Sequence, residues 1–278
     1  MDPSGQPIER RIEAAGVDTA VLERSGSGTP VVLWHGVPNS YAMWKPFRRH
    51  IEGPFLSPDM PGFGRSERPD PTGFDGTVEA LADWAEALID ALGLERYSLV
   101  AHDWGSIGLL AAARHPERIE RVVALNGVPY EYDYRWHWIA RTWRRRGLGE
   151  AFNGGATLAP VTSAILRQAR PGWRAMPKDF IADVIGDWDR GKSRAILSLY
   201  RSADPERLGR LGDALRRITS PALVLWGGAD PYIPSAFAAR WAARLGSAEL
   251  ELFDDAGHWP WIDRPDLIAR AGRFLAAG

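Results

Sequence analysis

An aspartate, Asp103, occupies a position in the chain that is typical of a catalytic nucleophile. Small residues flank it at a distance of two, with Ala101 before it and Gly105 after it in the segment LVAHDWGS (99–106). This spacing is typical of a sharp strand-to-helix turn that lifts the central side chain into a cleft, where serine is the usual occupant. We therefore predict that Asp103 stands at such a turn and acts as a nucleophile.

A carboxylate nucleophile restricts the reactions that this position can support. Attack on a carboxylic ester would form an anhydride, which is energetically unfavourable. Attack on a saturated carbon that carries a leaving group instead forms a stable alkyl ester, which activated water can hydrolyse in a second step. The residue type thus predicts a two-step hydrolysis through a covalent ester of Asp103.

Two more residues that could take part in this chemistry follow predicted strands. Asp230 follows the apolar run ALVLWGG (222–228), and His258 follows LELFDDAG (250–257). The carboxyl ends of parallel strands are where open α/β sheets bind ligands. We predict that His258 activates the hydrolytic water and that Asp230 holds the imidazole in the required tautomer, as the third member of a serine triad does.

Two other polar residues near predicted strand ends are given no such role. Asn126 follows an earlier strand, where a catalytic acid could also stand, but an amide cannot serve as that acid. Ser106 lies three positions after Asp103, where the helix begins. We interpret Ser106 as a polar residue at the helix N-terminus rather than as the nucleophile.

The elements that must position these residues alternate between strand and helix patterns. The spacing of apolar residues over 77–92 predicts an amphipathic helix, which Gly93 ends. Short apolar runs that end in turn residues predict buried parallel strands. The alternation predicts an α/β fold with a mostly parallel central sheet and helices on both faces. The strand patterns fall in the segments 31–36, 55–64, 97–101, 119–127, 221–231 and 248–261.

The pattern changes between residues 129 and 212. No strand-like run occurs there, and the helical patterns are rich in tryptophan, arginine and tyrosine. We predict a core of residues 1–128 and 213–278, interrupted by a helical cap of residues 129–212. The expected cap helices lie within 134–152, 156–169, 178–188 and 194–203.

Composition argues against several other classes of protein. A net charge of −1 over 278 residues argues against nucleic-acid binding, and the absence of cysteine excludes disulfides and thiolate metal sites. The six histidines lack metal-ligand spacing and no dinucleotide fingerprint occurs, so neither a metal nor a cofactor is expected. No segment reaches 18 apolar residues and no apolar leader begins the chain. We expect a cytoplasmic protein that binds no membrane; a homodimer is left open.

Several motifs together carry a resemblance to a known family. The chain resembles the α/β-hydrolase superfamily over essentially its whole length, and within it the aspartate-nucleophile branch of epoxide hydrolases and haloalkane dehalogenases. The resemblance implies an oxyanion hole made by the backbone N–H groups of Val37 and Trp104. His35 is expected to be structural and bonded within its turn. The motifs are HGVP (35–38), DMPGFGRS (59–66), HDWGS (102–106), WGGADP (226–231) and GHWPWIDRP (257–265).

An epoxide hydrolase is the first of two activities that the resemblance implies. An epoxide oxygen leaves as an alkoxide held in the product and needs a proton donor. The segment SLYRS (198–202) resembles the cap segment in which epoxide hydrolases place a tyrosine, so Tyr200 is expected to bind the substrate and protonate the leaving oxygen. These enzymes usually carry a second cap tyrosine, which the segment 145–152 lacks. The candidates left open are Tyr130, Tyr132 and Tyr134.

A haloalkane dehalogenase is the alternative, with the same nucleophile, histidine and acid. A halide leaves as a free anion and needs weak N–H donors, for which the indole of Trp104 is suited. Val37 stands where one dehalogenase group has asparagine, and another group uses a second tryptophan from the cap. The possible second donors are Trp136, Trp138, Trp143, Trp173 and Trp188. Tyr200 favours the epoxide hydrolase.

A third hypothesis is a binding protein that keeps the fold with an inactive site. Such proteins tend to lose the nucleophile, the acid or the histidine, and all three are present here. The tryptophan-rich cap further predicts that the substrate is a small apolar molecule. We therefore expect a cofactor-independent hydrolase that uses water as its second substrate.

Overall fold

An eight-stranded sheet forms the centre of the computed structural model, which describes residues 6–277. The strand order is β1-β2-β4-β3-β5-β6-β7-β8. β1 pairs antiparallel with β2 and β2 with β4, whereas all other neighbours are parallel. The predicted mostly parallel sheet is confirmed. The strands are β1 (Ile8–Ala14), β2 (Val17–Arg24), β3 (Val31–Trp34), β4 (Phe55–Pro58), β5 (Tyr97–His102), β6 (Ile119–Leu125), β7 (Pro221–Gly227) and β8 (Ser247–Phe253).

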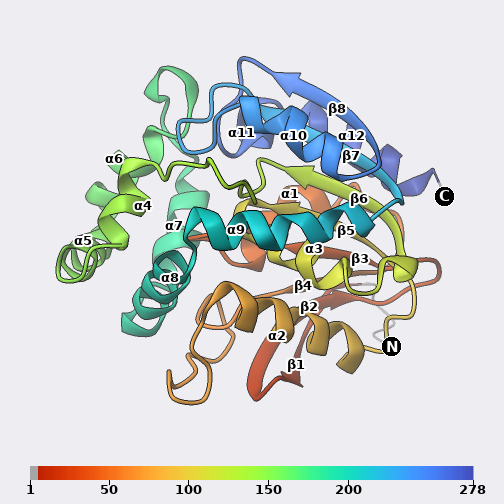
Figure 1. Ribbon diagram of the computed structural model, residues 1–278, viewed down its shortest axis with the longest axis horizontal. Coiled ribbons are helices and arrows are strands. Elements are labelled where there is room, and N and C mark those ends of the chain that lie inside the picture. Colours follow the sequence, from red (N-terminus) through yellow and green to blue (C-terminus); the bar gives the residue numbers. More distant parts are fainter. Residues whose placement is uncertain (1–5, 278) are drawn as a thin grey trace.

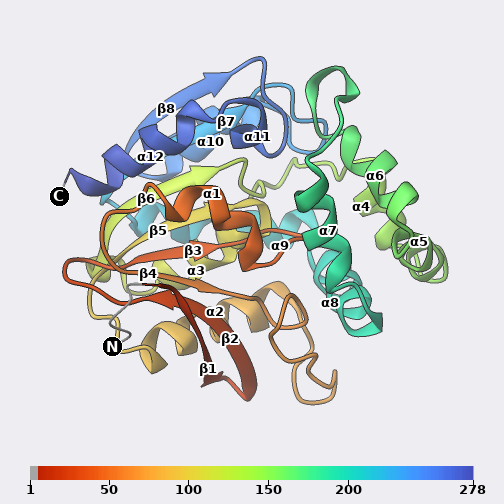
Figure 2. The same cartoon turned by 180° about the vertical axis from the view of Figure 1, so that it is seen from behind.

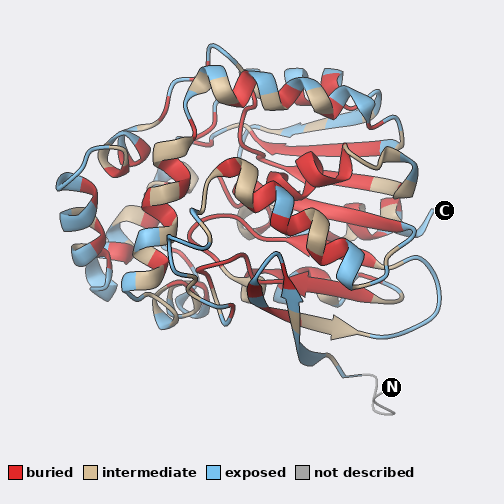
Figure 3. Cartoon of the chain, turned by 60° about the horizontal axis from the view of Figure 1, so that its bottom comes forward, coloured by how far each residue is buried: buried red, intermediate tan, exposed pale blue. Residues whose placement is uncertain are grey.

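Burial along the strands explains their sequence patterns. All residues of β3, β4 and β5 are buried, which accounts for their continuous apolar runs, since helices cover both faces of the sheet. The edge strand β8 instead carries exposed charges, and its Glu249 and Glu251 pair with Arg270. Charges of this kind discourage further strands from adding to an open edge. Figure 3 shows the central strands buried along their length and the exposed residues gathered on the outer faces of the helices.

Helices cover the two faces of the sheet (Figures 1 and 2). On one face lie α2 (Val78–Ala91), α3 (Ile107–Ala112) and α10 (Ala236–Arg244), and on the other lie α1 (Lys45–Arg48) and α12 (Asp266–Ala276). The hydroxyl of Thr77 accepts a hydrogen bond from the backbone N–H of Ala80 and caps α2, whose bounds match the predicted helix. The remaining core helix is α11 (Pro260–Asp263), and short 3₁₀ turns are η1 (Tyr41–Trp44), η2 (Asp103–Ser106), η3 (Pro116–Arg118) and η5 (Asp213–Arg217).

Six helices follow one another between β6 and β7, and all of them lie within the range predicted for the cap. In this part of the described chain no residue is assigned to a strand. The expected helix over 134–152 is divided in two, because Gly147 at φ 80° breaks it. The helices are α4 (Trp138–Trp143), α5 (Leu148–Ala156), α6 (Ala159–Arg167), α7 (Lys178–Gly186), α8 (Arg190–Ser202) and α9 (Pro205–Gly212), with the 3₁₀ turn η4 (Pro171–Trp173) after α6.

The helices α4–α8 lie beyond the carboxyl ends of the parallel strands, toward which the arrowheads point in Figure 1. The carboxylate of Asp187 accepts a hydrogen bond from the backbone N–H of Gly64 in the core at 2.6 Å. The same carboxylate pairs with the fully buried Lys192 of α8. The backbone N–H of His258 donates to the carbonyl of Ala169 at 2.9 Å. These contacts tie the helical segment to the core beside the strand ends. Within residues 6–277, no helix has the length and apolar character needed to cross a membrane.

Candidate active site

Asp103 lies at the sharp turn between β5 and α3, as predicted. Its φ of 50° falls in a region that residues other than glycine seldom adopt, so the backbone is strained there. Two glycines beside this turn, Gly105 and Gly36, leave no room for a larger side chain. A Cβ at Gly105 would lie 2.1 Å from the carbonyl oxygen of Trp34, and one at Gly36 would lie 2.5 Å from the Cβ of Asp103. The side chain of Asp103 is almost fully buried and lines a pocket.

Two backbone N–H groups contact the Asp103 carboxylate. The N–H of Val37 donates to its Oδ2 at 2.9 Å, and the N–H of Trp104 donates to the same carboxylate. These are the two donors that the resemblance to epoxide hydrolases and haloalkane dehalogenases implies for an oxyanion hole. Donors fixed in this way can stabilise negative charge on the same oxygen when an ester of Asp103 is attacked.

His258 and Asp230 lie together at the ends of β8 and β7. The Nδ1 of His258 is 2.8 Å from Oδ2 of Asp230. The other oxygen of Asp230 accepts hydrogen bonds from the backbone N–H groups of Tyr232 and Ile233 at 2.7 and 3.1 Å. A carboxylate fixed by this many donors holds the imidazole with its proton on Nδ1, which leaves Nε2 able to accept a proton from water.

Asn126 also contacts Asp230, a role that the sequence analysis did not identify. Its side-chain N–H donates to Oδ2 of Asp230 at 2.7 Å, and its Oδ1 accepts from the backbone N–H of Gly227 at 2.9 Å. As expected, Asn126 is not the acid itself. The contact depends on the pairing of β6 with β7 in the sheet, for which the sequence carries no local signal.

The pKa values of the three residues depend on burial and on one another. Burial raises the pKa of Asp103 to about 6, although the nearby His258 and the N–H groups of Trp104 and Val37 act in the opposite direction. Burial lowers the pKa of His258, but the carboxylates of Asp230 and Asp103 outweigh it, so the net pKa is raised. At neutral pH Asp103 is therefore ionised, as a nucleophile must be.

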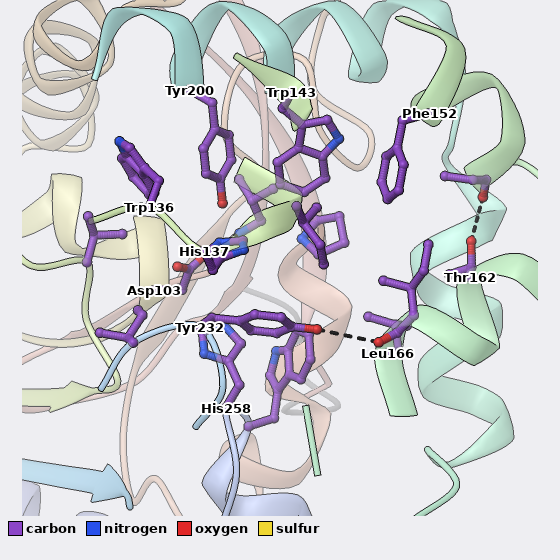
Figure 4. A pocket seen from close by; sticks show the side chains of 18 of the residues that line it. Asp103, Trp136, His137, Trp143, Phe152, Thr162, Leu166, Tyr200, Tyr232 and His258 are labelled. Atoms are coloured by element: carbon purple, nitrogen blue, oxygen red, sulfur yellow. Dashed lines mark hydrogen bonds between the residues drawn. The ribbon is translucent and has the colours of Figure 1, made fainter. Parts of the chain in front are cut away.

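Tyr200 of α8 faces the same pocket, and Figure 4 shows its hydroxyl pointing toward Asp103. Its ring is 4.7 Å from that of Trp143 and 5.1 Å from that of Trp136, measured between centroids. Burial and the negative charge of Asp103 hold the pKa of Tyr200 well above its usual value. The hydroxyl therefore keeps its proton at neutral pH. No acceptor for that proton is found among residues 6–277.

The rest of the pocket wall is mostly apolar and aromatic. Its lining contains no lysine, arginine or glutamate, and Asp103 is the one carboxylate among the lining residues described. A wall of this kind favours uncharged apolar ligands, with a few polar groups to orient them.

The fold agrees with the comparison to known families. A model of the alpha/beta hydrolase fold matches residues 29–265. The chain belongs to the alpha/beta hydrolase family.

Relatives of this alpha/beta hydrolase carry out different reactions at nearly equal identity. The chain is 29% identical to a cis-3-alkyl-4-alkyloxetan-2-one decarboxylase of Shewanella oneidensis, over 94% of this chain and 86% of the relative. It is 28% identical to haloalkane dehalogenase 2 of Mycobacterium tuberculosis, over 97% and 96% of the two chains. It is also 28% identical to epoxide hydrolase A of the same organism, over 96% of each. Identity alone therefore does not select a reaction.

Solved structures of a haloalkane dehalogenase and of an epoxide hydrolase both share this fold. Haloalkane dehalogenase DbeA from Bradyrhizobium elkani superimposes with a TM-score of 0.80 at 25% identity, covering 98% of both chains. Epoxide hydrolase CorEH superimposes with a TM-score of 0.81 at 17% identity, covering 98% of this chain and 99% of that chain. The second likeness concerns the fold alone.

The tryptophans of this alpha/beta hydrolase differ in whether their indole N–H groups can reach a ligand. Trp104 packs against Trp136 and Tyr200 and is not itself part of the pocket lining. Its buried N–H makes no hydrogen bond of regular geometry among residues 6–277, but it lies close enough to the Tyr200 hydroxyl to act on the pKa of that group. Trp138 and Trp173 are exposed. Three cap tryptophans line the pocket, but their N–H groups donate elsewhere: Trp136 to the carbonyl of Ala203, Trp143 to Oδ1 of Asn153, and Trp188 to Oγ of Ser193.

None of the three tyrosines left open for a second donor has an uncommitted hydroxyl. Tyr130 exchanges a hydrogen bond with Oγ of Ser106 at 3.1 Å, outside the pocket. Tyr132 is exposed, and its hydroxyl is directed to Asp213. Tyr134 lines the pocket, but its hydroxyl donates to the carbonyl of Tyr232 at 3.1 Å.

Tyr232 lines the pocket as well, although the sequence analysis did not identify it. Its hydroxyl is directed to the carbonyl of Ile165 at 3.4 Å, as Figure 4 shows near Leu166. Among the described tyrosines that line the pocket, Tyr200 alone has a hydroxyl without an acceptor.

His35 is structural, as expected: its Nδ1 lies 2.9 Å from the carbonyl of Gly36, and its Nε2 accepts from the N–H of Met60 at 2.9 Å.

Proposed function

We propose that this alpha/beta hydrolase opens epoxides to vicinal diols through a covalent ester of Asp103. The observation that carries the proposal is the position of Tyr200, whose protonated hydroxyl points into the pocket toward the Asp103 carboxylate. An oxygen that leaves a saturated carbon but stays in the product needs such a proton donor. The apolar wall supports a small uncharged substrate, with water as the second substrate.

In the first step, a carboxylate oxygen of Asp103 attacks one epoxide carbon and the C–O bond breaks. Tyr200 gives its proton to the departing oxygen, which becomes the first hydroxyl of the diol. The product of this step is an alkyl ester of Asp103 and a tyrosinate. The pocket excludes most of the solvent, and hydrogen bonds to the developing negative charge are stronger there than in water.

In the second step, Nε2 of His258 takes a proton from water, and the resulting hydroxide attacks the ester carbonyl of Asp103. The N–H groups of Val37 and Trp104 stabilise the oxyanion that forms. Asp230 stabilises the imidazolium, which then protonates the leaving alkoxide. The second proton of the water is at first on the regenerated Asp103 carboxyl. It then passes to the Tyr200 phenolate, which restores both residues.

A haloalkane dehalogenase is the second candidate, and the indole N–H of Trp104, which makes no hydrogen bond of regular geometry among residues 6–277, favours it. A halide would need that N–H and a second donor, but the three pocket-lining cap tryptophans donate theirs to protein acceptors. The two activities are separated by measuring diol formation and halide release on matched epoxides and bromoalkanes. A 3,4-dialkyl oxetan-2-one belongs in the same panel, because it too has a leaving oxygen on saturated carbon. The epoxide proposal requires diol formation to be the fastest reaction.

The Tyr200→Phe variant is expected to distinguish the two reactions within one protein. Loss of the general acid should slow ester formation from an epoxide by about 10²-fold or more. Ester formation from a bromoalkane needs no proton and should change by less than about threefold, since phenylalanine keeps the ring contacts with Trp136 and Trp143. Single-turnover kinetics on both substrates measure this. An unchanged epoxide rate would remove Tyr200 from the mechanism.

The Asp230→Asn variant is expected to stall the second step and spare the first. An amide would accept or donate without favouring the Nδ1–H tautomer of His258, and a change of this kind in a serine triad costs about 10⁴-fold. We expect ester hydrolysis to slow by roughly 10³-fold or more while ester formation stays within about fivefold. Intact-protein mass against time follows both steps, with Asp70→Asn, in an exposed loop, as the control. Rapid hydrolysis in the variant would contradict the role of Asp230.

A further inference from the structure

The pocket contains one imidazole that the two steps above do not use. His137 immediately precedes α4 and lines the pocket. Its Nδ1 accepts a hydrogen bond from the backbone N–H of Ala140 at 3.4 Å and so caps the helix. A ring nitrogen that accepts carries no proton, and the neutral imidazole then has its N–H on Nε2.

The charge state of His137 follows from its surroundings. Burial, together with the nearby His258, lowers the pKa of His137 to about 3. The charged groups that face it are His258 and Asp230 from the strand ends and Arg141 from its own helix, and of these only Asp230 acts to raise the pKa. His137 is thus neutral whenever Asp103 is ionised, and its Nε2–H is a hydrogen-bond donor rather than a base.

The His137 ring contacts the rings of Tyr232 and Tyr200, which also line the pocket. The His137 ring lies 4.8 Å from that of Tyr232, which in turn lies 5.1 Å from that of His258. It lies 6.5 Å from the ring of Tyr200, and Figure 4 shows the Tyr200 hydroxyl directed toward it, with Asp103 beside both. Among residues 6–277, Nε2 of His137 has no acceptor, and the residue lines the pocket.

We propose that His137 supplies the second hydrogen bond to the leaving oxygen, and the proposal rests on the epoxide-opening function above. An alkoxide has lone pairs for two donors at once. Tyr200 transfers its proton, while the Nε2–H of His137 stabilises the charge without giving up its own. The tyrosines that could have filled this place have hydroxyls directed to other groups. An imidazole therefore takes the role for which the sequence suggested a second tyrosine.

His137→Asn is the variant that tests this role. Asparagine is a good helix N-cap, so the N–H of Ala140 keeps an acceptor, but its short amide lacks the imidazole N–H. We expect ester formation at Asp103 from an epoxide to slow by about 10²-fold, the usual effect of removing one donor to a developing oxyanion. Ester hydrolysis and the melting temperature should stay unchanged. His115→Asn, at a half-exposed histidine beyond α3, is the matched control.

The outcomes separate this inference from the proposed function. If the wild type forms no ester with any epoxide, the proposed function fails and the role of His137 fails with it. If the wild type reacts and His137→Asn forms the ester at the same rate, or loses hydrolysis instead, the role of His137 alone is wrong. Nitrogen-15 NMR of the histidine side chains is independent of turnover and serves even where the variant does not fold. It should give a neutral Nε2–H tautomer for His137 from pH 5 to 8, and an Nδ1–H tautomer or a protonated ring would overturn the inference.

Discussion

The His258→Ala variant is expected to react once with an epoxide and then stop. Ester formation needs Asp103 and Tyr200, which remain, but the hydrolytic water loses the base that takes its proton. Loss of the catalytic histidine in a triad enzyme lowers kcat by about 10⁶-fold, so steady-state turnover should fall by roughly 10⁴-fold or more. Intact-protein mass should increase by the whole mass of the epoxide, located on Asp103 by peptide mapping. A bromoalkane would add the substrate without its halide.

The fold should tolerate this change. Asp230 keeps hydrogen bonds from Asn126, Tyr232 and Ile233 when the imidazole is absent, so its carboxylate does not become a buried charge without partners. His115→Ala, at a half-exposed residue paired with Glu86, serves as the control and should turn over normally. Repeated turnover by His258→Ala, or the absence of any adduct while the wild type reacts, would sink the two-step mechanism.

The positions of Asp103, Asp230 and His258 could be predicted from the sequence because the signals are local. Each residue follows a predicted strand, and parallel strands place their carboxyl ends at one edge of the sheet. The strands β5, β7 and β8 do so here, and the structure brings Nδ1 of His258 to 2.8 Å from Asp230. The spacing of Gly105 from Asp103 could be read in the sequence, but the contact with the carbonyl of Trp34 that requires a glycine there could not.

Features that depend on distant contacts could not be predicted in this way. The contact of Asn126 with Asp230 follows from the pairing of β6 with β7, which no local pattern reveals. The resemblance implies that a second donor to the leaving oxygen is a tyrosine. Whether a tyrosine hydroxyl is free to donate depends on contacts with distant backbone carbonyls, such as that of Tyr232 with Tyr134. Neither β1 nor β2 is predicted by the sequence analysis. The residues of β1 are mostly exposed and charged, and those of β2 are neither a continuous apolar run nor a regular alternation.

The Asp103→Asn variant is expected to lose ester formation with every substrate, by about 10⁴-fold or more, because an amide is not a nucleophile. The wild type provides the matching positive result. After one turnover in ¹⁸O-enriched water, one carboxylate oxygen of Asp103 should carry the label, since hydroxide attacks the ester carbonyl. Mass spectrometry of the peptide that contains Asp103 detects this. Turnover that leaves no label in Asp103 would mean that water attacks the substrate directly.

The same substitution is expected to stabilise the fold. The pKa of Asp103 is raised from 3.8 to about 6, so the folded protein holds this proton more tightly than the unfolded chain does. Such a group lowers stability as the pH rises from about 4 to 6, and the loss persists above that range. Asparagine also adopts the φ of 50° more readily than most residues. We expect the free energy of unfolding to increase by about 1 to 3 kcal/mol at pH 8 and the gain to shrink as the pH falls from about 6 to 4.

Denaturant unfolding at pH 8 and at pH 4 measures this difference, and intact mass confirms that the asparagine has not deamidated. Asp70→Asn is a suitable control, because its carboxylate is exposed and its pKa is lowered by hydrogen bonds from Thr72. That variant should lose stability at pH 8 rather than gain it, since it removes a favourable ionised group. A gain for Asp103→Asn that is equal at both pH values would assign the effect to backbone strain alone. A loss at pH 8 would mean that the buried carboxylate stabilises the fold, and the cost of holding an ionised nucleophile in an apolar pocket would then have to be met by the hydrogen bonds from Val37 and Trp104.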